Sequence, residues 1–159
     1  MESSRVDEEL TDRFIGAITD WVQQLIRMNT LVATDLGLIP TDLHCLHVLQ
    51  QDGPMTTGKL GEHVGLSAGA ASRMIDRLES AGFVTRARDV ADRRKVTVAT
   101  TPAGLERAGT AYGGLTERTR RDLASFTSDE LQVIIRFVEL SLRSVESEAS
   151  ALATRGTPA

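Results

Sequence analysis

The chain has 159 residues, of which 41% are hydrophobic and 25% charged, a composition that fits one folded domain and excludes a disordered chain. No run of about 18 apolar residues occurs, and charged side chains interrupt the first twenty positions. We therefore expect neither a membrane span nor a secretory signal, and a cytoplasmic protein. A single cysteine, Cys45, excludes an intrachain disulfide, and an aromatic content of 4% disfavours a groove lined with stacking rings.

The formal net charge of −4 is distributed unevenly along the chain. Residues 56–101 contain eight basic and five acidic side chains and carry +3, whereas the rest of the chain carries −7. A basic segment between acidic ends is typical of a protein that presents one face to a polyanion. On charge alone, ordinary fluctuation explains the asymmetry equally well.

A long amphipathic helix is predicted for residues 8–36, because apolar side chains recur there every three or four positions. These positions are Leu10, Phe14, Ile18, Trp21, Leu25, Met28 and Val32. A second helix is predicted to start at Pro40, Thr41 and Asp42, with a threonine or its neighbour as the cap, and to stop at residues 52–54.

Two further helices, separated by a very short turn, form a helix-turn-helix pattern. The first opens at residues 56–57 and breaks at Gly65, and the second starts after Ser67, a good N-cap, and closes at Gly82. Valine- and threonine-rich segments at 83–88 and 96–100 then predict a two-stranded hairpin with a cationic tip. A helix-turn-helix followed by such a hairpin is a winged helix.

The last third of the chain returns to helix. Thr101 and Pro102 predict one helix start, a glycine pair at 113–114 weakens that helix, and Thr127 with Glu130 forms a capping box for a last helix. The fold class is therefore mainly α, with residues 41–101 forming a winged helix-turn-helix within a single chain of 159 residues. The helices of residues 8–36 and 102–152 have more apolar surface than the winged-helix lobe of residues 41–101 can cover. We therefore expect them to form a helical dimerisation region in a homodimer.

The first two turns of the second helix of the motif are the turns that enter the major groove of DNA. They contain Ser67, Gly69, Ser72 and Arg73, where small side chains allow close approach and the arginine can bind guanine or hold a phosphate. Ser67 is at the same time a helix cap. A two-fold dimer would place two such helices about 34 Å apart, as an inverted-repeat operator in double-stranded DNA requires.

Further basic residues are predicted to contact DNA around this helix. Arg77, one turn later, is equally well explained by a salt bridge to Asp76 or Glu79. At the hairpin tip, Arg93, Arg94 and Lys95 would reach the adjacent minor groove or its phosphates. The remaining expected phosphate contacts, which position the protein without reading sequence, are Thr57, Lys59, Arg86 and Arg88.

The sequence resembles the multiple antibiotic resistance regulator (MarR) family of bacterial transcription factors. The similarity rests on residues 56–64, Leu66-Ser67, residues 72–79, Gly82-Phe83-Val84, residues 89–94 and residues 100–104. The resemblance implies that Asp92 and Arg94 match the family's wing motif, in which the aspartate pairs with an arginine and shapes the tip, so Arg93 is the better candidate for groove insertion. It also implies a ligand pocket between the dimer helices and the winged helix, lined by Trp21, Leu25, Leu43 and His47, although a lone tryptophan at a periodic position is more often core.

The resulting hypothesis is a transcriptional regulator, most simply a repressor that a small amphipathic molecule, such as a phenol, releases from its operator. A metal- or thiol-responsive regulator is the first alternative, because His44, Cys45 and His47 are close in sequence and some members of the family sense metals or oxidants. No metal site or cofactor is predicted, since the cysteine has no partner and the histidines share no clear ligand set. No phosphate loop or nucleophile elbow indicates an enzyme. The second alternative, a winged helix that binds only protein, is disfavoured by the cationic wing.

Overall fold

The computed structural model describes residues 2–88 and 96–155, with side chains for residues 7–87 and 96–155. The chain divides into two compact units, Met1–Gly113 and Gly114–Ala159. The boundary falls within the glycine pair that the sequence indicates as a weak point of the helix. In the described ranges, no helix is long and apolar enough to cross a membrane.

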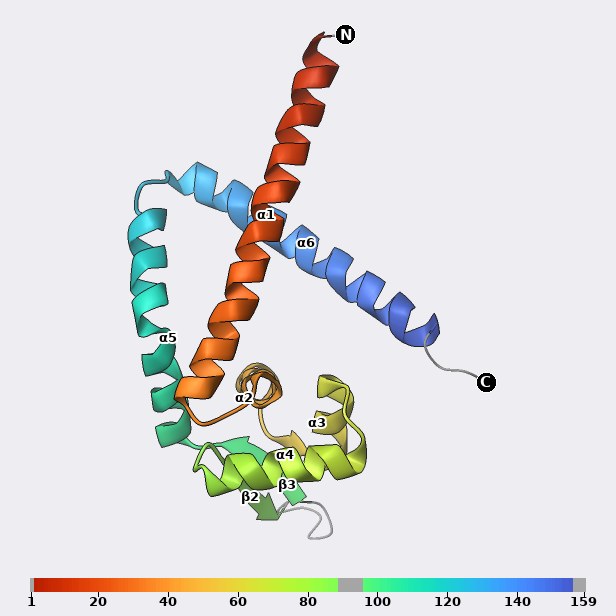
Figure 1. Cartoon of the computed structure of the whole chain (residues 1–159), viewed down its shortest axis with the longest axis vertical. Helices are drawn as coiled ribbons and strands as arrows, with labels where there is room; N and C mark the ends of the chain where they lie inside the picture. The colour runs from red at the N-terminus through yellow and green to blue at the C-terminus, as the bar shows by residue number, and fades with distance from the viewer. Residues whose placement is uncertain (1, 89–95, 156–159) are drawn as a thin grey trace. The chain divides into compact units, whose positions relative to one another are not determined.

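The described residues form six helices and three strands, and Figure 1 shows their course. The helices are α1 (Glu2–Asp35), α2 (Pro40–Asp52), α3 (Thr57–Val64), α4 (Ala68–Ser80), α5 (Pro102–Leu123) and α6 (Ser128–Arg155). The strands are β1 (Met55–Thr56), β2 (Val84–Arg88) and β3 (Val96–Thr100). The predicted order of elements and the mainly helical, winged helix-turn-helix fold class are confirmed.

The helix-turn-helix consists of α3, a short turn and α4. Gly65 ends α3 in the left-handed conformation, with φ at 70°, a region that glycine enters without steric cost. The hydroxyl of Ser67 then accepts the Ala70 N–H at 3.4 Å and caps α4. Close packing of the two helices depends on Gly61, because a Cβ placed there would lie 3.0 Å from the Cβ of Ala71. The predicted break and cap are both present.

The wing belongs to a three-stranded antiparallel sheet with strand order β1-β3-β2. Arg86 pairs with Val98 across β2 and β3, and Met55 pairs with the same Val98 from the other side. The sequence predicts only the two long strands. Periodicity does not reveal the third strand, because it has two residues and carries no alternation of its own.

The core of the first unit lies where α2, α3, α4 and the sheet meet. Its largest fully buried apolar side chains are Phe83, Leu60, Met74, Ile75, Leu78 and Val98. The end of α1 adds Val32 and Ala33 to the same cluster. Burial of this apolar surface is the main favourable term for folding the winged-helix lobe.

The start of α5 is held against the segment that follows α4. The hydroxyl of Thr101 donates to the Gly82 carbonyl at 2.7 Å and accepts the Gly104 N–H at 2.9 Å, so it caps the helix as predicted. Gly104 is buried, and a Cβ there would lie 2.6 Å from the Cα of Phe83. Only glycine allows this approach, which explains the glycine at position 104.

The long terminal helices expose much of their apolar surface. In α1, Trp21 is 57% exposed and therefore does not belong to the core of the chain, contrary to the simplest interpretation of a lone tryptophan. In α6 no described residue is buried, and its exposed apolar side chains are Val133, Ile135, Phe137, Val138, Leu140, Leu142, Val145 and Leu152. The Thr127–Glu130 capping box at its start is present, with the Thr127 N–H donating to Glu130 at 2.8 Å.

Candidate nucleic-acid interface

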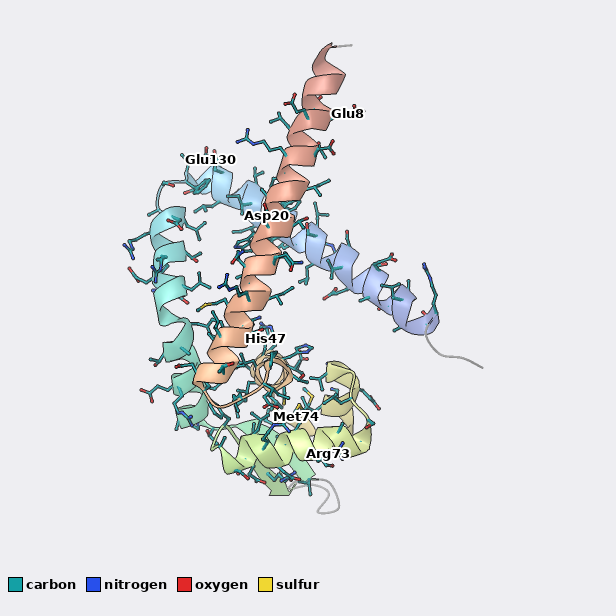
Figure 2. The ribbon with its side chains drawn as sticks, viewed as in Figure 1. Glu8, Asp20, His47, Arg73, Met74 and Glu130 are labelled. Atoms are coloured by element: carbon teal, nitrogen blue, oxygen red, sulfur yellow. The ribbon has the colours of Figure 1, made fainter. Side chains whose placement is uncertain are left out.

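The exposed face of α4 carries the side chains expected to read DNA. Ser67, Gly69, Ser72 and Arg73 are all exposed, whereas the opposite face of the helix packs into the core through residues such as Met74. Figure 2 labels Arg73 and Met74 on this helix. In the first two turns of the helix, this face combines small residues with the long cationic side chain of Arg73, which allows the helix to approach base edges closely.

The first turn of α3, the helix that precedes α4 in the helix-turn-helix, also carries predicted DNA contacts. Thr56 caps the helix by accepting the Lys59 N–H at 3.4 Å. Thr57 is half-buried and Lys59 is exposed. A lysine and backbone N–H groups at a helix start are groups that can hold a phosphate, and the phosphate contacts of Thr57 and Lys59 stay predictions.

Arg77 does not pair with its sequence neighbours. Its guanidinium instead forms a two-pronged ion pair with Asp42, with Nη2 2.6 Å from Oδ1 and Nε 3.1 Å from Oδ2. The hydrogen bond to Asp42 raises the pKa of Arg77 above its ordinary value. The predicted partners Asp76 and Glu79 are therefore wrong for this arginine, because folding brings α2 into contact with α4 and no local pattern reveals that.

Arg86 takes the partners that the sequence assigns to Arg77. It lies on β2, where its guanidinium contacts Asp76 at 2.5 Å and also Glu79, and its backbone N–H donates to Glu79 at 3.1 Å. These hydrogen bonds, led by the one to Asp76, raise its pKa. The predicted phosphate contact is thus a cation already engaged by two carboxylates, which fasten the base of the wing to α4.

Five predicted wing residues lie wholly or partly outside the described part of the chain. Only the backbone of Arg88 is described, as the last residue of β2. Asp92, Arg93, Arg94 and Lys95 lie outside the described residues. Their proposed roles in groove insertion and in shaping the wing tip stay predictions.

A cavity of about 760 Å³ lies within the first unit, between α1, α2 and the beginning of α5. Leu43 and His47 are on its wall, whereas Trp21 and Leu25 do not line it. The cavity lies further toward the C-terminal end of α1 than the sequence indicates. Its lining residues are Ile26, Asn29, Thr30, Pro40, Leu43, His44, Leu46, His47, Gln50, Leu105, Ala108, Gly109 and Tyr112.

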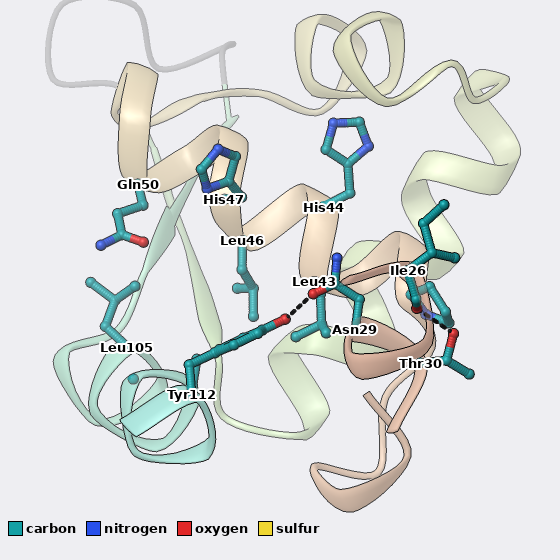
Figure 3. A pocket seen from close by; sticks show the side chains of 13 residues that line it. Ile26, Asn29, Thr30, Leu43, His44, Leu46, His47, Gln50, Leu105 and Tyr112 are labelled. Carbon is teal, nitrogen blue, oxygen red and sulfur yellow. Dashed lines mark hydrogen bonds between the residues drawn. The ribbon is translucent and has the colours of Figure 1, made fainter. Parts of the chain in front are cut away.

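The polar groups of the cavity come from three helices, as Figure 3 shows. The Tyr112 hydroxyl donates to Asn29 Oδ1 at 2.6 Å, which links α5 to α1 across the wall. Burial raises the pKa of Tyr112, so the phenol stays protonated and remains a donor. His44 and His47 are both exposed on α2 and border the same space. The wall is thus largely apolar with several hydrogen-bonding groups, a lining suited to a small amphipathic molecule.

Cys45 does not line this cavity and is completely buried in the core. Burial, with a smaller contribution from the Asp42 charge, raises the pKa of its thiol to about 12. The reactive form of cysteine is the thiolate, so this side chain is poorly suited to oxidant sensing. In the part of the chain that the structure describes, no three His, Cys, Asp or Glu side chains gather as a metal site.

Comparison with known proteins agrees with this geometry. Residues 38–96 match the model of the MarR family. The chain is 38% identical over 127 residues to YcgE of Bacillus subtilis, an HTH-type transcriptional regulator, and the match covers 80% of this chain and 82% of YcgE. The chain belongs to the MarR family. It is accordingly a MarR-family transcriptional regulator with a helix-turn-helix DNA-binding fold, as the sequence predicts.

Solved structures show the same fold at lower identity. RV1404 from Mycobacterium tuberculosis aligns with a TM-score of 0.67 and 19% identity, over 83% of this chain and 92% of that one. A C80S mutant of MarR from E. coli in complex with operator DNA aligns with a TM-score of 0.53 and 23% identity, over 80% of this chain and 93% of that one. These likenesses support the winged-helix fold of this MarR-family chain.

Proposed function

We propose that this MarR-family regulator binds inverted-repeat operator DNA as a homodimer and acts as a repressor. The observation that carries the proposal is the start of α4, where Ser67, Gly69, Ser72 and Arg73 are all exposed. Arg73 is expected to bind guanine, while Lys59 and Thr57 hold phosphates beside it. The solved complex of an E. coli MarR mutant with operator DNA has the same fold, which supports this use of the helix.

Homodimerisation is supported by the terminal helices. In α1, Leu10, Phe14 and Ile15 are exposed together with other apolar side chains, and α6 exposes an apolar row that includes Leu142 and Val145. Apolar surfaces of this extent on soluble proteins are normally covered by a partner. A second copy of the chain supplies an identical apolar helix. It also supplies the second recognition helix that a palindromic operator requires.

Dimerisation can be tested by sedimentation of the wild-type protein and two variants. The account expects twice the 17.2 kDa chain mass for the wild type, and a dissociation constant of the dimer raised by about 100-fold or more in Leu142→Asp. Ser147→Asp adds the same charge at an exposed polar position of α6 and serves as the matched control. A monomeric wild type, or equal effects of the two substitutions, would contradict the homodimer.

Effector binding is proposed for the cavity between α1, α2 and α5. The first turn of α2 contributes Pro40 and Leu43 to the cavity wall and also carries Asp42, which holds Arg77 of α4. A ligand that moves this turn therefore acts on an element tied to the reading helix. To lower operator affinity, the ligand must bind the released arrangement more tightly than the DNA-bound one.

The cavity can be probed with the amphipathic dye anilinonaphthalene sulfonate. Gly109 lines the cavity and has open space where a Cβ would lie, so Gly109→Leu should fill part of the site. Gly113→Leu makes the same change at a position of α5 that does not line the cavity and also has free space. Dye binding should fall in Gly109→Leu only, and added dye should weaken operator binding of the wild type more than that of Gly109→Leu. Equal dye binding by both variants would contradict an effector site here.

The operator itself is found by selection. The purified protein is titrated against a pool of random duplexes at two salt concentrations, and the retained DNA is sequenced. The proposal expects an inverted repeat with half-sites about one helical turn apart, and affinity that falls steeply as salt rises. Retention without an enriched motif would contradict sequence reading, and no retention at either salt would favour a protein-binding winged helix.

A further inference from the structure

Asp42 and Arg77 form the one described ion pair that connects α2 with α4. The carboxylate is fully buried, whereas the arginine side chain is 43% exposed. Two guanidinium nitrogens reach the two carboxylate oxygens, and the Ile39 N–H donates to Oδ2 at 3.1 Å. The buried charge is therefore compensated by three donors directed at its two oxygens.

This ion pair fixes the orientation of α4 relative to α2, which the apolar core alone specifies less sharply. The inward face of α4 is held by Ala71, Met74, Ile75 and Leu78, and contacts of this kind are non-directional. A two-pronged arginine–carboxylate pair instead specifies direction and distance. Arg77 lies one helical turn after Arg73 on the same helix. Loss of the ion pair would permit a small rotation of α4, and that rotation would move Arg73, the arginine that is proposed to read bases.

We propose that Arg77 is a positioning residue for sequence reading: through Asp42 it fixes the rotation and axial position of α4 on the first turn of α2, and it does not serve as a phosphate contact. The inference rests on the proposed function, in which α4 enters the major groove. Turning Arg77 toward a phosphate would leave Asp42 buried without its cation, which is strongly unfavourable.

The experiment measures affinity for the selected operator and for a scrambled duplex of equal length, each at several salt concentrations. Arg77→Lys keeps the charge and removes the planar fork, Arg77→Met removes the charge, and Asp42→Asn keeps the shape of the carboxylate and leaves Arg77 in place. Lys59→Met, which removes an exposed cation from α3, is the control for a phosphate contact. Cooperative heat unfolding of each variant establishes that it is folded.

For both Arg77→Lys and Asp42→Asn, the ratio of operator to scrambled affinity should fall by about tenfold, comparable to one mismatched base pair. Affinity for the scrambled duplex should not weaken, and its salt dependence should keep the wild-type slope. Lys59→Met should show the reverse pattern, with an unchanged ratio and a slope reduced by about 0.9. A merely structural loss of stability would lower both affinities together.

Two results would overturn the inference while leaving the proposed function intact. The first is an unchanged operator preference in Asp42→Asn. The second is a slope reduced by about 0.9 in Arg77→Met, which would make Arg77 a phosphate contact. If the Arg77 variants do not fold, Asp42→Asn decides by itself, because it retains the arginine. A wild type that binds operator and scrambled duplex equally would instead overturn the proposed function.

Discussion

The winged-helix lobe and the terminal helices differ in how much of their apolar surface is buried within one chain. In the lobe, side chains such as Phe83, Leu60 and Leu78 are fully buried within one chain, and the buried charge of Asp42 has its own partner. In α6, apolar side chains of similar size, among them Leu142 and Val145, are more than half exposed. The lobe therefore buries its large apolar side chains within one chain, whereas the terminal helices leave theirs exposed, and the proposed homodimer would cover them.

The largest expected effect sets a leucine of one region against a leucine of the other. Leu78→Ala should lower the free energy of unfolding by about 2–5 kcal/mol, because it opens a cavity in a packed core. Leu142→Ala removes the same atoms from a side chain that is 57% exposed, so its effect should appear only in the stability of the dimer. Urea unfolding at two protein concentrations measures both quantities.

A concentration-independent loss in Leu78→Ala and a concentration-dependent loss in Leu142→Ala would sharpen the comparison. Losses of similar size that do not depend on concentration in either variant would break it. In that case α6 would be stabilised within its own chain.

A smaller effect on stability is expected from substitutions of two glycines in α5, Gly104 and Gly113. Gly104→Ala should destabilise the protein by about 1–3 kcal/mol, since its Cβ would lie 2.6 Å from the Cα of Phe83. Gly113→Ala, in the same helix with open space around it, should instead stabilise by about 0.5–1 kcal/mol through helix propensity. Thermal unfolding of both variants checks the opposite signs, and equal signs would refute the tight packing at Gly104.

The effect that is smallest at ordinary pH concerns the buried thiol of Cys45, because its contribution to stability changes only above pH 9. Its pKa is raised from 9.0 to about 12, so the folded state keeps the proton while the unfolded state loses it above pH 9. The stability that this proton contributes is complete below pH 9 and is lost as pH rises toward 12. The slope is about 1.4 kcal/mol per pH unit.

The difference in unfolding free energy between wild type and Cys45→Ala isolates this contribution from other titrating groups. The difference should be constant below pH 9 and should shrink above it. A difference that does not vary with pH would show that the thiol ionises normally in the folded lobe and would reopen the thiol-responsive alternative.

Local signals in the sequence are sufficient for most of the fold. Gly65, Ser67 and Thr101 act through backbone geometry or through hydrogen bonds within a few residues, and each does in the structure what its position predicts. The exposed face of α4 follows from helical periodicity in the same way. The sequence does not predict the two-residue strand β1, because this strand is defined only by its pairing with β3.

The side-chain partners could not be predicted, because they depend on which elements meet in space. Arg77 finds Asp42 across 35 residues, and Tyr112 finds Asn29 across 83. An aspartate in the first turn of α2 looks like an ordinary helix-start residue, since it also accepts the Ile39 N–H. The sequence places the cavity too near the middle of α1, because amphipathic periodicity does not show where along its length a helix meets its neighbours.

The measurement that tests the central claim most directly compares Arg73→Ala with Lys59→Ala on the selected operator and on operators changed at single base pairs. Lys59→Ala should weaken binding to every duplex by the same factor. Arg73→Ala should also remove about 1–3 kcal/mol of discrimination at one position of each half-site. Equal proportional losses from the two variants on all duplexes would contradict base reading by the exposed face of α4.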